Sequence, residues 1–404
     1  MDGSIQPIKG ALPIAIKARE DGFEGLIIPQ QNAREAAVVN QLKVYGVSNI
    51  REVIEFFNNE RELEPTVVNT REEFYAHQST FEFDFADVKG QENVKRALEV
   101  AAAGGHNLIM IGAPGSGKSM MAKRLPSILP PLSLGESLET TKIHSVAGKL
   151  GAERGLLSQR PFRAPHHMTS QVALIGGGQS PQPGEVSLAH NGVLFLDELP
   201  EFGRSVLEVL RQPLEDKKIV VSRARYSVEY PANFTLVAAM NPCPCGFFPD
   251  RSRCSCTPMQ IQNYLNRLSR PILERFDICV EAAPVSFLEL EDQTMANEDS
   301  ATIRSRVEKA VKIQNYRFQG TDIHSNSRMG QKEIQRFCQL KEAERRFARK
   351  VYEARGISAR GYHRVLKTAR TIADLAGEEW IQKEHLSEAF GYRALEERIW
   401  GQKH

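Results

Sequence analysis

The chain carries Gly112-Ala113-Pro114-Gly115-Ser116-Gly117-Lys118-Ser119, which matches the pattern Gly-x-x-x-x-Gly-Lys-Ser/Thr. An apolar run at residues 107–111 precedes this stretch, and a helix-compatible run at residues 120–125 follows it. The order predicts a strand, a glycine-rich loop and a helix. Glycines let backbone N–H groups turn towards phosphate oxygens, and a helix N-terminus adds partial positive charge. The stretch therefore predicts a triphosphate site, with Lys118 on the β- and γ-phosphates and Ser119 on Mg²⁺.

A second apolar run, Val193-Leu194-Phe195-Leu196, ends in Asp197 and Glu198. Carboxylates at the end of a buried strand suit metal binding and base catalysis beside a phosphate loop. We expect Asp197 to hold Mg²⁺ through its water shell and Glu198 to orient and polarise the attacking water. The alternative is that the acidic pair simply begins a helix.

A third apolar run, residues 236–240, ends in Asn241, whose amide could contact the γ-phosphate or the water. The alternative is an Asn-Pro turn that ends the strand. Further along, Arg275 stands at the end of a predicted helix, where it could reach the γ-phosphate of a neighbouring subunit in a ring. Arg270 is the second candidate for that role, and a surface ion pair with Glu274 or Asp277 is the alternative.

Ser358 to Arg364 predicts the start of a helix in the C-terminal part of the chain. We expect Arg360 to be a lid arginine that contacts phosphate, with Arg364 as the second candidate. A solvated basic helix face is the alternative.

The apolar patterns divide the chain into parts. Residues 1–60 predict a small α/β fragment with a strand at 26–29 and helices at 33–45 and 49–58, and polar residues 61–80 predict a linker. Short apolar runs alternating with helical patterns over residues 81–285 predict a doubly wound parallel sheet. After an acidic, loop-like stretch at 288–300, residues 301–404 predict a helical lid.

Composition is that of an ordinary globular protein, with 404 residues, 41% hydrophobic, 25% charged and a formal net charge of +2. A net charge this small gives no argument about nucleic acid, so any anion binding must come from local patches. The sequence shows neither an apolar run long enough for a membrane span nor the basic and apolar regions of a signal peptide. We therefore expect a cytoplasmic protein without membrane contact.

Four of the six cysteines are clustered as Cys243-x-Cys245 and Cys254-x-Cys256. Four thiolates can coordinate structural Zn²⁺ tetrahedrally, and thiols stay reduced in the cytosol. Free or redox-active thiols are the alternative, because Cys-x₂-Cys is the more usual zinc spacing. The pair His166-His167 is less suited to metal binding, because adjacent side chains are expected to point apart.

Residues 217–229 predict a β-hairpin with a basic tip at Arg223 and Arg225, and Lys217 and Lys218 on its approach. Copies of this hairpin in a ring would line the pore and attract nucleic-acid phosphates. Tyr226 could stack on a base. A solvated charged turn is the alternative.

Taken in order, these motifs resemble the AAA+ fold. The strings at 162–167, 183–192, 238–246 and 369–375 more specifically resemble the ComM (YifB) family of magnesium-chelatase-like ATPases. The resemblance covers nearly the whole chain. It implies an insertion within about 155–190, a hairpin before the Asn241 strand, a homo-hexameric ring, and DNA branch migration on single-stranded or branched DNA.

The family normally begins with a complete Lon-protease-like S5 domain, and residues 1–60 resemble only its second half. Ile14 stands where Lon proteases carry the catalytic lysine. The resemblance therefore implies an ATPase that is not a protease. A chelatase-type motor and a protein-remodelling ATPase remain as alternatives to DNA translocation.

Overall fold

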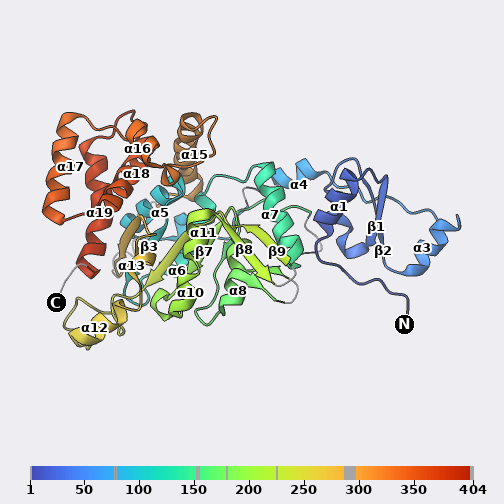
Figure 1. Cartoon of the computed structure of the whole chain (residues 1–404), viewed down its shortest axis with the longest axis horizontal. Coiled ribbons are helices and arrows are strands. Elements are labelled where there is room, and N and C mark those ends of the chain that lie inside the picture. The colour runs from blue at the N-terminus through green and yellow to red at the C-terminus, as the bar shows by residue number, and fades with distance from the viewer. Residues whose placement is uncertain are drawn as a thin grey trace.

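The computed structural model describes residues 2–76, 78, 80–151, 155–178, 181–223, 226–285 and 297–400. The molecule is elongated, with the N-terminal fragment at one end, the central sheet in the middle and the C-terminal helices at the other end (Figure 1).

Within the described residues, five parallel strands form the central sheet in the order β11-β3-β10-β7-β4. These strands are Ile278–Ala282 (β11), Leu108–Gly112 (β3), Thr235–Met240 (β10), Val193–Leu196 (β7) and Phe162–Arg163 (β4). Every residue of β3 and β7 is buried, as expected of continuous apolar runs covered on both faces. The predicted α/β class and parallel sheet are confirmed.

The C-terminal helices pack directly onto the sheet domain rather than standing apart from it. They are Ser300–Arg317 (α15), Gln331–Phe337 (α16), Glu342–Arg355 (α17), Ala359–Ala376 (α18) and Lys383–Trp400 (α19). A single hydrophobic core joins α5 (Glu92–Gly104) and α6 (Lys118–Ile128) to this bundle through residues such as Leu98, Val307 and Ile372. The predicted helical C-terminal region is confirmed.

A buried polar bridge fixes the bundle to the amino end of the sheet. His106 is fully buried. Its Nδ1 lies 3.2 Å from Asp277 Oδ2, and its Nε2 lies 2.8 Å from the Thr371 hydroxyl of α18. Asp277 immediately precedes β11, so the bridge holds the second half of α18 against the amino end of the sheet.

The N-terminal fragment has its own small core. It contains Ala11–Glu20 (α1), Gly25–Pro29 (β1), Ala33–Ala37 (α2), Lys43–Val47 (β2) and Ile50–Phe57 (α3), with β1 and β2 paired in parallel. The fragment docks on α7 (Leu134–Ala147), where Glu35 accepts hydrogen bonds from the Leu12 N–H and the Ser145 hydroxyl.

The predicted helix at residues 33–45 is wrong beyond Ala37. The backbone turns through a left-handed Gln41 (φ 65°), and residues 43–47 form a strand instead. Val44 and Val47 are β-branched and buried beside β1, so packing decides against the helical pattern. The strand predicted at 26–29 and the helix predicted at 49–58 are confirmed, the latter capped by Asn49.

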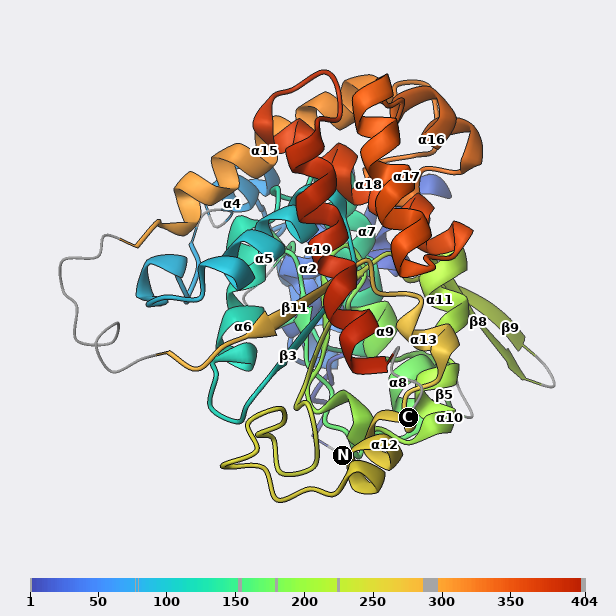
Figure 2. The same ribbon diagram turned by 90° about the vertical axis from the view of Figure 1, so that its left-hand side faces the viewer.

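Smaller elements decorate the sheet domain. The segment between β4 and β7 holds α8 (Gln171–Ile175), the antiparallel pair β5 (Gly176–Gly177) and β6 (Gln182–Pro183), and α9 (Glu185–Leu188). The hairpin formed by β8 (Lys218–Arg223) and β9 (Tyr226–Pro231) projects from the body in Figure 2. The remaining elements are Gln30–Asn32 (η1), Thr70–Ala76 (α4), Phe85–Asp87 (η2), Leu199–Glu201 (η3), Arg204–Glu208 (α10), Arg211–Asp216 (α11), Pro258–Leu265 (α12), Arg270–Leu273 (α13) and Asn326–Arg328 (η4).

Across the part of the chain that the structure describes, no helix is both long and apolar enough to cross a bilayer.

Candidate functional site

The carboxyl ends of three neighbouring strands bring the predicted catalytic residues together. The phosphate loop (residues 112–119) follows β3, Asn241 follows β10, and Asp197 and Glu198 follow β7. Because the strands are parallel and adjacent, all three loops open at one edge of the sheet. This is the edge where ligands bind in open parallel sheets.

The phosphate loop has the backbone that its glycines predict. Gly115 (φ 77°) and Gly117 (φ 82°) are left-handed, so a side chain at either position would be strained. Lys118 begins α6, and its ammonium donates to the carbonyl oxygens of Gly112 (2.8 Å) and Ala113 (2.9 Å). Burial lowers the pKa of Lys118, and the Asp197 charge opposes that shift. The lysine, the loop N–H groups and the N-terminus of α6 together favour a polyanion.

The metal-binding and sensor candidates touch the loop directly. The Ser119 hydroxyl donates to Asp197 Oδ2 at 2.5 Å. Lys118 Nζ lies 3.3 Å from Asn241 Oδ1. A hydroxyl and a carboxylate oxygen are hard ligands suited to Mg²⁺, which binds one or two protein groups and the substrate phosphates. The site can therefore hold Mg²⁺ with Ser119 and Asp197.

Glu198 lies next to Asp197, and its backbone has an unusual conformation. Its φ of 52° and ψ of 47° are left-handed, and its N–H donates to Asp197 Oδ1 at 3.0 Å. Its carboxylate lies 3.3 Å from Nδ1 of His167. The sequence did not predict that contact. One feature of the sequence could have indicated the contact, namely the position of His167 shortly after the residues that form β4. This edge strand pairs in parallel with β7, so the residues that follow the two strands lie near each other.

The expectation that His166 and His167 point apart is wrong. Their rings pack together with centroids 4.1 Å apart and planes 35° from parallel. The turn containing them is closed by a hydrogen bond from the Thr169 N–H to the His166 carbonyl, which lets adjacent side chains converge.

Arg275 and Arg360 lie at the other end of the sheet, where the parallel strands begin. Arg275 and Arg360 line one cavity of about 320 Å³ with Asn107 and Asp277, which precede β3 and β11. Five residues of strand at 3.3 Å each separate this edge from the phosphate loop by about 16 Å. The structure does not bring Arg360 to the phosphate loop of its own chain. Arg270 begins α13, just before Arg275.

The arginine cluster (Arg275, Arg360 and Arg364) concentrates positive charge. Burial lowers the pKa of Arg275, and the charges of Arg211, Arg364 and Arg360 lower it further. Arg275 forms an ion pair with Glu215, and Arg360 lies 3.6 Å from Glu274. Arg364 donates to the Phe276 carbonyl at 3.4 Å, so it is held against the backbone while Arg360 is largely exposed.

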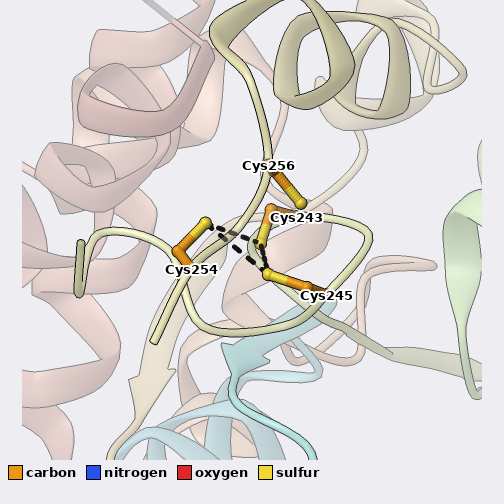
Figure 3. Close-up of side chains that lie close together, drawn as sticks. All are labelled: Cys243, Cys245, Cys254 and Cys256. Atoms are coloured by element: carbon orange, nitrogen blue, oxygen red, sulfur yellow. Dashed lines mark hydrogen bonds between the residues drawn. The ribbon is translucent and has the colours of Figure 1, made fainter. Parts of the chain in front are cut away.

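The cysteine loop (residues 243–256) gathers the four predicted thiols (Figure 3). The sulfurs all lie within 4.8 Å of one another, with Cys243 3.4 Å from Cys245 and 3.8 Å from Cys254. A tetrahedral zinc site with Zn–S bonds of 2.3 Å places its sulfurs about 3.8 Å apart. The donor set and its spacing therefore fit zinc.

The thiols differ in acidity. A hydrogen bond from the Phe247 backbone lowers the pKa of Cys245 to about 6. Burial raises the pKa of Cys256 to about 12. A metal cation would favour the thiolate form of both.

The cysteine loop also presses on the phosphate loop. A Cβ on Gly246 (φ 86°) would lie 2.3 Å from Pro114 Cδ, so only glycine fits there. A cavity of about 590 Å³ opens between the two loops, with Gly112, Phe247 and Ile399 among its walls.

The predicted nucleic-acid residues are only partly described. Lys218 pairs with Glu229 across the hairpin at 2.8 Å, and Lys217 places its ammonium 5.5 Å from the Phe234 ring centroid. Lys217, which directly precedes β8, also lines the cavity of the arginine cluster. The backbone of Arg223 belongs to β8, and Arg225 lies outside the described residues.

The parallel sheet, the phosphate loop at its carboxyl edge and the helical bundle define a protein of the AAA+ class. A family model described as "Magnesium chelatase, subunit ChlI" matches residues 84–290, and the model for its C-terminal region matches residues 297–393. "Competence protein ComM" of Haemophilus influenzae is 43% identical over 396 residues, covering 98% of this chain and 76% of that protein. "Uncharacterized protein YifB" of Escherichia coli is 40% identical over 403 residues, with the same coverage. The chain belongs to this ComM and YifB family of magnesium-chelatase-like proteins.

A more distant similarity is partial. "Lon protease 2" of Bacillus subtilis is 30% identical over 204 residues, which cover 42% of this chain and 35% of that protein.

Proposed function

We propose that this chain is an ATP-hydrolysing motor subunit that works in a homo-hexameric ring on DNA. The observation that carries the ATPase assignment is the meeting of Lys118, Ser119, Asp197 and Asn241 at one edge of the sheet, with Glu198 beside them. These are the groups that phosphoryl transfer to water needs, namely a cation, a metal-binding pair, a polar sensor and a base.

Each residue has a defined part in the proposed reaction. Lys118 and the N–H groups of residues 112–119 bind the phosphates, and Asn241 orients the γ-phosphate or the water. Glu198 accepts a proton from the attacking water. Mg²⁺, held by Ser119 and Asp197, would neutralise charge on the phosphates.

A neighbouring subunit completes the proposed site. Arg275 and Arg360 share one cavity at the amino edge of the sheet, whereas the phosphate loop lies at the carboxyl edge. Arginines at the amino ends of the strands are too far from the phosphate loop of their own chain, but they could contact nucleotide bound to a second chain. In a closed ring, one subunit's arginines would face the next subunit's phosphates and stabilise transition-state charge.

DNA is the proposed polymer because of the family and the hairpin. One relative, 43% identical to this chain, is named a competence protein. The β8–β9 hairpin projects from the body (Figure 2), and the amino-acid sequence over 217–225 is basic. The fit of four thiolates to zinc supports a structural Zn²⁺ in the cysteine loop. Ile14 at the position of the Lon lysine supports an enzyme without protease activity.

The test is ATP hydrolysis by the purified chain with and without single-stranded or branched DNA, at about 50 and 200 mM salt. We expect stimulation that falls steeply with salt, because phosphate contacts release counterions. ATP turnover that no DNA changes at low salt would favour a chelatase-type or protein-remodelling motor over a DNA motor.

A further inference from the structure

Arg328 is a fourth arginine in the wall of the cavity that the arginine cluster lines. It ends the short helix η4, and the cavity places it at the same end of the sheet as Arg275 and Arg360. Lys217 and Lys367 add two further positive charges to the walls. The three carboxylates of the cavity already have the partners described above. The cavity therefore holds more positive than negative charge.

The guanidinium of Arg328 is partly buried and has no ion pair among the described residues. Within that part of the chain its side chain makes one hydrogen bond, from Nη2 to Asn233 Oδ1 at 3.2 Å, although a guanidinium carries several more N–H donors. Burial lowers the pKa of Arg328 to about 10, a shift that a nearby carboxylate would oppose. A desolvated cation without a partner is costly, so this arginine is suited to pair with an incoming anion.

A buried polar network fixes the position of Arg328. Asn326, two residues earlier in η4, is fully buried. Its amide donates to Asp374 Oδ2 at 2.7 Å and to the Thr371 hydroxyl at 3.1 Å, both on α18. Its backbone N–H donates to Gln314 Oε1 at 2.8 Å. Because η4 is held in this way, the charge of Arg328 stands at a fixed place before any ligand arrives.

Arg275 differs from Arg328 because it already has a counter-ion. Its ion pair with Glu215 must break before the guanidinium can bind a phosphate. Its Nε is buried and has no hydrogen-bond partner among the described residues, so this guanidinium also lacks an acceptor. An oxyanion in the cavity could pair with Arg328 at once and then offer Arg275 the acceptor that it lacks.

We propose that Arg328 is a further phosphate-binding residue of the site between subunits, and that it contacts the neighbouring chain's nucleotide before Arg275 exchanges Glu215 for the same phosphates. This inference rests on the proposed ATPase function and ring. Arg328 supplies affinity, because its charge is available both before and during cleavage. Arg275 stabilises the charge that develops during cleavage, and only such differential contacts raise kcat.

The first experiment compares the full chain carrying Arg328→Ala, Arg328→Lys or Asn233→Ala with wild type. We expect Arg328→Ala to raise the KM for ATP by about tenfold, the size of one charge-assisted contact, and to change kcat much less. Arg328→Lys keeps a cation and should recover most of the affinity. Asn233→Ala is the matched control, since it removes the hydrogen bond to Arg328 but leaves its charge, and it should behave as wild type.

A mixture of two variants tests whether the phosphates belong to a neighbour. Arg328→Ala keeps an intact phosphate loop, and Lys118→Ala keeps an intact Arg328, so mixed rings contain complete sites. The mixture is measured at protein concentrations where gel filtration shows assembly, and at ATP concentrations near the wild-type KM. Its turnover should exceed that of Arg328→Ala alone.

A wild-type KM in Arg328→Ala would overturn the proposal. An equal rise of KM in Asn233→Ala would do so too, because Arg328 would then be only a brace between the bundle and the sheet. A mixture no faster than Arg328→Ala alone would show that its anion is not a neighbour's phosphate. Thermal melting without nucleotide confirms that the variants remain folded. Turnover that wild type shows and Lys118→Ala lacks supports the ATPase assignment whatever Arg328→Ala does, so the two proposals fail separately.

Discussion

The hydroxyl of Ser119 donates a 2.5 Å hydrogen bond to Asp197, although 78 residues separate the two positions in the sequence. The contact exists because β3 and β7 flank β10 in a parallel sheet, so the loops that follow them meet. A hydroxyl and a carboxylate held this close form a ready pair of ligands for one divalent cation.

Lys118→Ala should lower the rate of ATP turnover by about a hundredfold or more. The ammonium is the strongest local positive charge in the phosphate loop, and nothing replaces it on the β- and γ-phosphates. Phosphate release and fluorescent-nucleotide binding measure the effect. Circular dichroism of the variant should match wild type, and turnover near the wild-type rate would remove the phosphate loop from the mechanism.

Glu198→Gln should bind ATP with near wild-type affinity and hydrolyse it at least about a hundredfold more slowly. The amide keeps the shape of the side chain but cannot accept the proton of the attacking water. Retention of unhydrolysed ATP after rapid desalting is the direct measurement. Normal single-turnover hydrolysis would assign the base to another residue.

Arg275→Ala should lose activity by about a thousandfold while retaining ATP binding to its own phosphate loop. A mixture of Arg275→Ala with Lys118→Ala should regain part of the lost activity. Each variant supplies the half that the other lacks, provided that sites form between subunits. Arg349→Ala, in an exposed i,i+4 pair with Glu353, is the matched control and should behave as wild type. Failure of the mixture to regain turnover, with assembly intact, would argue for a site within one chain.

Removal of metal from the cysteine loop should lower both thermal stability and nucleotide affinity. The purified chain should contain about one zinc ion, since four thiolates make one tetrahedral site. Gly246 packs on Pro114, so a loosened cysteine loop would disturb the phosphate loop. Elemental analysis, then melting and nucleotide titration of Cys254→Ser, test this. Ser255→Ala, at an exposed position between two of the cysteines, is the control, and a zinc-free wild-type chain would contradict the assignment.

Asp277→Asn should destabilise the junction between sheet and bundle by about 2 kcal/mol. Burial raises the pKa of Asp277, but the hydrogen bond and charge of His106 outweigh it and place the pKa below the ordinary 3.8. A depressed carboxyl pKa contributes stability that is complete above the unfolded pKa and is lost as pH falls through the folded value. Urea unfolding should thus show a large difference between variant and wild type at neutral pH and a smaller one below about pH 4. An equal difference in unfolding free energy between variant and wild type at both pH values would show that the ionised carboxylate of Asp277 does not stabilise the junction.

The phosphate loop and its flanking strands were predictable because their signal is local. A fixed glycine spacing between an apolar run and a helix requires no knowledge of the rest of the chain. The same holds for Asp197 and Asn241, which directly follow apolar runs, and parallel pairing then brings them together.

Other features depend on packing that no local pattern encodes. Residues 38–45 carry enough apolar residues to suit a helix or a strand, and only the partner β1 decides between them. The position of Arg360 depends on how α18 docks through His106 and Thr371, which placed it beside Arg275 rather than beside its own phosphate loop. The contact of His167 with Glu198 depends on the order of β4 and β7 in the sheet.

The opposite placement of the phosphate loop and the arginine cluster has a consequence for concentration. If active sites form between subunits as proposed, a single molecule holds two half-sites and no complete site, so dilution alone should abolish its activity. Specific activity would then climb with the amount of protein present, and the cell could switch the enzyme on by abundance, with no inhibitor required.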